Sequence, residues 1–182
     1  LIAQVLLSPG DTVAVESLGY KPAWNAFSAA NANLVAIKQG IDFHLDLNHL
    51  KQVFIKNKPR LLYLTPLHQY PTTVTLSVAD RALVYQLAAR HNVAIIEDDY
   101  DHEFHYASQP LAPMAANDPS GLVIYLSTFS KILFPGCRLG FIAAGPELIE
   151  QLVAFRSIVN HKSNVLVQAA VGQWMREGGL ER

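Results

Sequence analysis

Short apolar runs alternate along the chain with longer segments in which apolar residues recur at helical spacing. The short runs predict strands over residues 12–16, 34–37, 60–65, 93–98, 122–127 and 140–144. The longer segments predict helices over residues 22–31, 46–57, 78–91, 146–159 and 164–177. Strands that are apolar on both faces and separated by helices are typical of a largely parallel sheet that is covered on both sides. We therefore predict an α/β fold, a three-layer α/β/α sandwich around a mainly parallel sheet.

Length and end patterns set the expected domain organisation. A chain of 182 residues is long enough for one domain with a sizeable core. Its start, LIAQVLLSPGD, opens within an apolar helical pattern that has no N-cap residue, and its end, WMREGGLER, has no closing element. We expect residues 1–182 to be part of a single domain that is cut at both ends.

Composition narrows the class of protein. Hydrophobic residues make up 51% of the chain and charged residues 16%, and the formal net charge is −1, so no basic face for nucleic acid is visible. The single cysteine, Cys137, excludes an intrachain disulfide and a cysteine-based metal site. No apolar run reaches membrane-spanning length, and the first residues lack the features of a signal peptide. We expect a soluble protein of the reducing cytoplasm, without a membrane partner.

Three of the predicted strands are followed by polar clusters. Leu64 is followed by TPLHQYPTT, Ile96 by EDDYDHEFHY and Leu126 by STFSK. In parallel sheets, ligands gather outside the carboxyl ends of the strands. If the sheet is parallel, the three clusters share one rim, and we expect a binding site there.

The segment STFSKILFPGCRLGF, residues 127–141, combines an amine, hydroxyls and a guanidinium. A lysine amine in an apolar setting, here Lys131, is a nucleophile that can form a Schiff base with a carbonyl. Arg138 with the hydroxyls of Thr128 and Ser130 suits the oxygens of a phosphate. These side chains predict a site for a phosphorylated carbonyl compound.

Carboxylate and phenol groups near the end of the preceding strand complete the pattern. Asp98 can pair with a protonated ring nitrogen and keep it charged, which an electron-sink cofactor requires. Tyr100 can donate a hydrogen bond to a ring oxygen. An aldehyde, a phosphate and a pyridinium nitrogen occur together in pyridoxal 5'-phosphate, which is the cofactor that we predict.

Other interpretations of these motifs are less favoured. The cluster EDDYDHEFHY contains six possible metal ligands, but their spacing matches neither an EF-hand loop nor a helical histidine pair: Asp98, Asp99, Asp101, His102, Glu103 and His105. TFSK has the shape of a serine acyl-transfer motif, but it begins with threonine, and no Lys-Thr-Gly follows. Cys137 is favoured as a buried small hydrophobe, and His68 as a hydrogen-bonded loop histidine. We therefore predict no metal site.

Four motifs together resemble the large domain of fold-type I aminotransferases, which have the aspartate aminotransferase fold. They are SPGDTVAVESLGY, TPLHQYPTT, IIEDDYDHEFHY and STFSKILFPGCRLGF. The resemblance covers essentially the whole chain, and it is closer still to the aminotransferase-like domain of MocR/GabR regulators in the GntR group. It implies a pyridoxal-phosphate-dependent transferase large domain.

The resemblance also implies a role for each candidate residue. Lys131 corresponds to the Schiff-base lysine, Asp98 to the partner of the pyridine nitrogen and Tyr100 to the partner of the ring hydroxyl. The phosphate ligands correspond to Arg138, Ser130 and Thr128. Tyr20, after ESLG, falls near the place where the family has an aromatic side chain over the cofactor ring.

The chain also departs from the family's pattern. Ordinary aminotransferases have Asn-Pro-Thr-Gly where this chain has YPTT, so Tyr70 replaces the asparagine that touches the ring hydroxyl and Thr73 replaces the glycine. Tyrosine at this place, after His68 and Gln69, is similar to the regulators. By resemblance, a phosphate-capping segment would lie before Leu1 and a small domain with a substrate-binding arginine would lie after Arg182.

Two functions follow from the resemblance. The first is a cofactor-binding domain of a GntR/MocR-type transcription factor, in which an amino compound displaces the Schiff base on Lys131 and shifts a two-state homodimer. Its DNA-binding helix-turn-helix would lie outside this chain. The second is a working aminotransferase, in which Lys131 also moves the proton as general base and acid.

Overall fold

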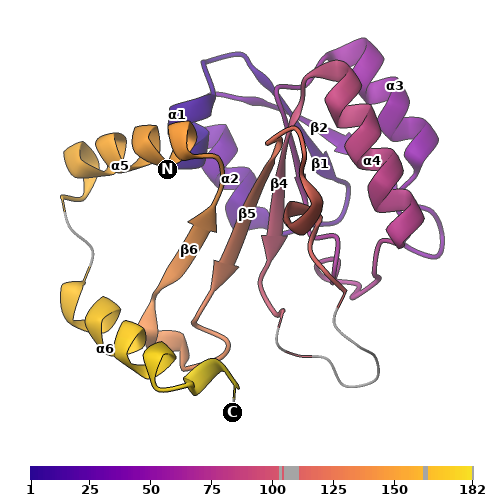
Figure 1. The fold of residues 1–182 in the computed structure, drawn as a ribbon. Coiled ribbons are helices and arrows are strands. Elements are labelled where there is room, and N and C mark those ends of the chain that lie inside the picture. The colour runs from indigo at the N-terminus through magenta and orange to yellow at the C-terminus, as the bar shows by residue number, and fades with distance from the viewer. Residues whose placement is uncertain (103, 105–110, 162–163, 182) are drawn as a thin grey trace.

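The computed structural model describes residues 1–102, 104, 111–161 and 164–181 (Figure 1). Six strands form one sheet in the order β2-β1-β3-β4-β5-β6. Strands β1 to β5 are parallel to one another, and β6 is antiparallel to β5. The strands are β1 (Thr12–Glu16), β2 (Asn33–Ile37), β3 (Leu61–Leu64), β4 (Ala94–Asp99), β5 (Val123–Thr128) and β6 (Gly140–Ala143). Each lies within about one residue of its predicted range, which confirms the mainly parallel sheet.

Helices cover both faces of the sheet, as Figure 1 shows. They are α1 (Ile2–Leu6), α2 (Lys21–Ala29), α3 (Leu47–Asn57), α4 (Val78–His91), α5 (Pro146–Val159) and α6 (Val165–Arg176). Short 3-10 turns are η1 (Met114–Asn117), η2 (Pro135–Cys137) and η3 (Gly179–Glu181). Helices α1, α2 and α5 pack on one face, and α3 and α4 pack on the other. The three-layer α/β/α sandwich is therefore confirmed. No helix among the described residues is long and apolar enough to cross a membrane.

Capping residues explain where the two helices of the second face begin. The side chain of Asp46 accepts from the backbone N–H of His49 at the start of α3, and Ser77 accepts from that of Asp80 at the start of α4. Each bond satisfies one of the backbone donors that have no partner in the first helical turn. At the other end of α4, Asn92 adopts the left-handed conformation that commonly ends helices.

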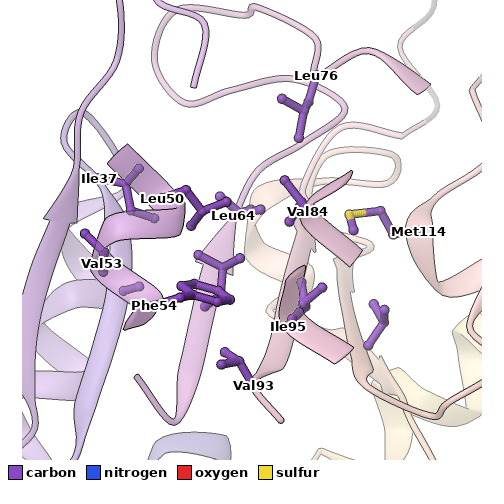
Figure 2. Close-up of a cluster of buried hydrophobic side chains, with 14 residues drawn as sticks. Ile37, Leu50, Val53, Phe54, Leu64, Leu76, Val84, Val93, Ile95 and Met114 are labelled. Carbon is purple, nitrogen blue, oxygen red and sulfur yellow. The ribbon is translucent and has the colours of Figure 1, made fainter. Parts of the chain in front are cut away.

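Alternation along the strands divides the core into two clusters. Leu62 and Leu64 belong to the cluster under α3 and α4, where Phe54 and Val84 are fully buried. Figure 2 shows Leu64 with these two side chains. Tyr63, between Leu62 and Leu64, points to the opposite face with the residues under α1, α2 and α5. Fully burying a leucine contributes about 1.5–3 kcal/mol. The two clusters therefore hold both helical layers against the sheet.

The parallel topology places the predicted polar clusters on one rim. Strands β3, β4 and β5 are paired in parallel register, so their carboxyl ends, and the segments that follow them, lie at the same edge of the sheet. The end of β1, which carries Glu16, lies at this edge too. Among the residues that the structure describes, it thus confirms that those after Leu64, Ile96 and Leu126 share one rim.

Candidate cofactor site

The half-buried Asp98 and the buried Tyr63 form a polar pair at the rim. The hydroxyl of Tyr63 donates to Asp98 Oδ2 at 2.5 Å. Burial raises the pKa of the Asp98 carboxyl, and the hydrogen bond from Tyr63 opposes that rise. Burial also raises the pKa of Tyr63, and the neighbouring carboxylate of Asp98 adds to the effect. The Asp98 carboxylate of this pair therefore offers hydrogen-bond acceptors to a ligand in surroundings of low dielectric constant.

Tyr63 is not among the residues that the sequence predicted, although a signal was present. A tyrosine within the otherwise apolar strand LLYL has a hydroxyl that needs a partner when it is buried. In the sheet, Tyr63 is paired with Ile96, so Asp98 is the next residue along β4 that faces the same side. Only the pairing register links the two residues, which are 35 positions apart.

A cavity of about 400 Å³ opens beside this pair. Its wall is mostly apolar and contains Asp98 and Tyr20, two of the predicted site residues. The lining residues come from α1, α2 and the strands: Leu1, Ile2, Ala3, Tyr20, Pro22, Ala23, Ala26, Phe27, Tyr63, Ile96, Asp98, Leu126 and Ile142. Ligand pockets are commonly about 300–1,000 Å³, apolar and provided with a few polar groups. A cavity with a carboxylate and aromatic walls fits a flat ring that carries a protonated nitrogen.

Three tyrosines extend along the rim from this cavity, and we call Tyr20, Tyr70 and Tyr100 the aromatic row. Their rings meet edge to face, with centroids 5.4 Å apart for Tyr20 and Tyr70 and 6.1 Å apart for Tyr70 and Tyr100. Burial, followed by the charges of Asp101 and Asp98, raises the pKa of Tyr100 to about 12. The structure therefore brings together four of the predicted residues, the aromatic row and Asp98.

The remaining four predicted residues lie on the connection between β5 and β6. Thr128 ends β5, and its hydroxyl accepts from the backbone N–H of Ser130 at 3.1 Å and donates to the carbonyl of Leu139 at 3.2 Å. Lys131 follows in a turn, and Arg138 has a left-handed backbone with a φ of 48°. The connection is thus a closed loop whose two ends meet at Thr128.

Lys131 and Arg138 are exposed in the structure. The apolar setting that we expected for the Lys131 amine is therefore not observed. The start of the loop is nonetheless next to the cavity, because Leu126 lines the cavity and is paired with Asp98 across β4 and β5. The roles of Lys131, Arg138, Ser130 and Thr128 stay predictions.

Apolar packing fixes the loop that carries these groups. Phe129 and Cys137 are buried, and they pack with Val171 of α6 in a small separate cluster. Cys137 is therefore a buried small hydrophobe, as the sequence indicated. Because Phe129 and Cys137 hold the loop near both of its ends, they limit the positions that Lys131 and Arg138 can reach.

The other acidic residues of the cluster after β4 have separate partners. Asp99 lies on the opposite face from Asp98, where it accepts from the Tyr125 hydroxyl at 2.7 Å and lies 2.7 Å from His102 Nδ1. Asp101 Oδ1 is 2.8 Å from Nδ1 of His68, a hydrogen-bonded loop histidine as expected. Among the residues that the structure describes, no three His, Cys, Asp or Glu side chains lie close enough to hold a metal ion. Glu103 and His105 lie outside the described residues.

Comparison with known proteins connects this geometry to a family. The sequence model described as "Aminotransferase class I and II" matches residues 1–180. The chain belongs to the class I and II aminotransferase family. It is 34% identical over 178 residues to the probable rhizopine catabolism regulatory protein MocR of Rhizobium meliloti, and 33% identical over 186 residues to aromatic-amino-acid aminotransferase 1 of Thermococcus litoralis.

Solved structures of aminotransferases have the same fold. The kynurenine aminotransferase of Pyrococcus horikoshii matches this aminotransferase-family chain with a TM-score of 0.93, 31% identity and 99% of the chain covered. LysN, the alpha-aminoadipate aminotransferase of Thermus thermophilus, matches with a TM-score of 0.91, 30% identity and 99% coverage, and was solved with N-(5'-phosphopyridoxyl)-L-leucine.

The aminotransferase-family chain spans only part of these proteins. Its match covers 98% of the chain but 35% of the MocR protein, and 100% of the chain but 45% of the Thermococcus enzyme. The match covers 46% of the solved kynurenine aminotransferase chain and 47% of the solved LysN chain. The shared part contains the sheet and its rim.

Proposed function

We propose that residues 1–182 are part of the large domain of a GntR/MocR-type regulator that binds pyridoxal 5'-phosphate and senses an amino compound. The observation that carries the proposal is the cavity that is lined by both the half-buried Asp98 carboxylate and the aromatic ring of Tyr20. A carboxylate and an aromatic ring suit the protonated nitrogen and the flat ring of the cofactor. The similarity to MocR and the HQYPTT and EDDYDHEF motifs support the regulator.

Each predicted residue has a part in holding the cofactor. Asp98 would pair with the ring nitrogen, and Tyr20 would cover the ring. Tyr70 and Tyr100 would lie beside the ring hydroxyl. The phosphate would be held by Arg138, Ser130 and Thr128, and the aldehyde by Lys131. When bound, the cofactor supplies an electrophilic aldehyde and an electron-withdrawing ring.

Partners follow from the same proposal. The ligand is a small amino compound, and DNA would be bound by a domain separate from residues 1–182. Large hydrophobic side chains of α5 and α6 are exposed, among them Ile158 and Leu166 at 76% and 82%. Exposed apolar surface of this kind favours a homodimer. Buried Cys137, the single cysteine, suits a protein of the cytoplasm.

A second candidate function is a working aminotransferase. The Thermococcus relative is as similar to the chain as MocR is, and both solved neighbours are aminotransferases. In that case Lys131 would also move a proton to and from the substrate.

The cofactor proposal is tested by visible absorbance of the protein at its natural length, after addition of pyridoxal 5'-phosphate. We expect a band that is absent from the Lys131→Ala variant, because an amine is needed to hold the aldehyde. Lys51→Ala, a lysine of α3 on the far layer, serves as the matched control and should retain the band. The same spectrum for the wild type and Lys131→Ala would refute the assignment.

A second experiment distinguishes the two functions. The natural-length protein is mixed with an amino acid and a 2-oxo acid, and the product is followed over many turnovers. A regulator is expected to show an amine-dependent change in DNA affinity without steady turnover. Steady turnover without any effect of amines on DNA binding would instead establish the aminotransferase.

A further inference from the structure

Glu16 is a buried carboxylate at the end of β1 with a direct connection to the aromatic row. Its exposed fraction is 5%. Oε2 accepts from both the backbone N–H and the hydroxyl of Thr65, each at 3.1 Å. The same hydroxyl accepts from the backbone N–H of Tyr70 at 2.9 Å. One threonine therefore joins the carboxylate to the backbone of the middle residue of the row.

Gln69 ties the two segments of the rim together beside this chain of bonds. It is 4% exposed, and its Nε2 donates to the carbonyl of Leu18 at 2.7 Å and to that of Tyr70 at 2.5 Å. Its Oε1 accepts from the hydroxyl of Thr72 at 2.6 Å. Leu18 is two residues before Tyr20. The Gln69 side chain thus links the backbone near Tyr20 to the backbone of Tyr70.

We propose that Glu16 is a positioning residue of the cofactor site, which holds the aromatic row in place through Thr65. The inference depends on the proposed function, because the row matters only if it contacts the cofactor. An ionised carboxylate is a stronger acceptor than a neutral carboxyl, and hydrogen bonds to charged groups are about twice as strong as neutral ones. The ionised form of Glu16 therefore fixes Thr65, and with it Tyr70, most firmly.

The charge of Glu16 is set by the groups that face it. Thr65 and Gln69 contact it from the segment after β3, His44 lines the same small cavity, and Tyr63 feels its charge from the neighbouring strand. Burial raises the pKa of Glu16 to about 7, and the hydrogen bonds from Thr65 and Gln69 oppose that rise. The carboxyl therefore changes its charge near neutral pH, and its hold on Tyr70 strengthens as the pH rises through 7.

The test compares the dissociation constant of pyridoxal 5'-phosphate in the natural-length wild type and in Glu16→Gln. At pH 8 we expect the variant to bind about tenfold more weakly, because it lacks the ionised acceptor. At pH 6 the wild-type side chain is mainly protonated and resembles glutamine, so the two constants should agree within about twofold. A general loss of packing would give the same ratio at both pH values.

A second pair of variants tests the link through Thr65. Thr65→Ser keeps the hydroxyl and should bind within about threefold of the wild type, whereas the isosteric Thr65→Val should bind about tenfold more weakly. Asp118→Asn is the control, because that carboxylate bonds Tyr85 and the start of β5 and not the aromatic row.

The outcomes separate the inference from the proposed function. If the wild type and Asp118→Asn do not bind the cofactor at all, the proposed function fails. If they bind the cofactor, two results would show that the positioning role of Glu16 is wrong. One is a ratio of dissociation constants between the wild type and Glu16→Gln that is the same at pH 6 and pH 8. The other is a Thr65→Val variant that binds the cofactor as tightly as Thr65→Ser does.

Discussion

Thr73 occupies the position where the aminotransferase pattern has glycine, and its backbone explains the usual preference. Its φ is 63°, in the left-handed region that a β-branched residue rarely adopts. Its backbone N–H donates to the carbonyl of Gln69 at 2.7 Å, which closes the turn behind Tyr70. The turn therefore keeps the glycine-type conformation although the residue has changed.

Replacing Thr73 with glycine is expected to stabilise the protein by about 1 kcal/mol. The strain of a non-glycine residue at positive φ, about 1–3 kcal/mol, is larger than the entropy that glycine loses on folding, about 0.5–1 kcal/mol. The free energy of unfolding from denaturant titration measures the effect. Thr72→Gly is the matched control and should be destabilising, because the Thr72 hydroxyl donates to Gln69.

At the scale of elements, the antiparallel step from β5 to β6 is what forms the loop that carries Lys131. Thr128 is paired with Gly140, so the loop leaves and re-enters the sheet at the same place. A Cβ at Gly140 would be 2.8 Å from the carbonyl oxygen of Ser127, closer than real Cβ atoms approach. The glycine therefore permits the close pairing that sets both ends of the loop.

Gly140→Ala is expected to destabilise the protein by about 1–3 kcal/mol, the usual cost of overpacking, because the backbone of β5 must move. The same variant should weaken the binding of pyridoxal 5'-phosphate, which equilibrium titration measures. Gly172→Ala in the interior of α6 is the contrasting control. Its Cβ meets only the end of the Arg176 side chain, so it should stabilise by up to about 1 kcal/mol. Equal stability changes in both variants would contradict the close-approach argument.

At the scale of the whole molecule, buried and half-buried carboxylates gather near the rim, and the rest of the sandwich must stabilise them. Burial raises the pKa of Glu16, Glu97 and Asp98, although each accepts hydrogen bonds. Ionising them therefore costs free energy in the folded state. The two apolar clusters on either side of the sheet offset this cost, which places a charged site on a rigid framework.

The pH dependence of stability should reveal the contribution of Glu16. Its pKa is about 7 when folded against 4.5 for the free group, so the folded state binds the proton more tightly. The contribution of this group to the free energy of unfolding is fully present below about pH 4.5. It is lost as the pH rises to 7, and the total loss is about 3 kcal/mol. Urea titrations between pH 5 and pH 8 should show a smaller fall for Glu16→Gln than for the wild type. Parallel curves would show that the carboxyl does not titrate in this range.

The sequence by itself determined the layered fold and the rim on which the candidate site lies. Apolar periodicity predicted the strands to within about one residue and the helices α2 to α6 to within about two, because burial on two faces requires it, whereas α1 was not among the predicted helices. Parallel strands share a rim, so the order of the elements alone places the polar residues after Leu64, Ile96 and Leu126 together. These properties depend on local pattern and on a general rule of sheet topology.

Only the tertiary structure decided which side chains meet. EDD contains adjacent carboxylates, and the pleat of β4 sends Asp98 toward Tyr63 and Asp99 toward Tyr125. The partnership of Glu16 with Thr65 spans 49 positions and depends on the pairing of β1 with β3. The exposure of Lys131 was also unforeseen. Such contacts depend on strand order and register, which a pattern along one chain segment does not contain.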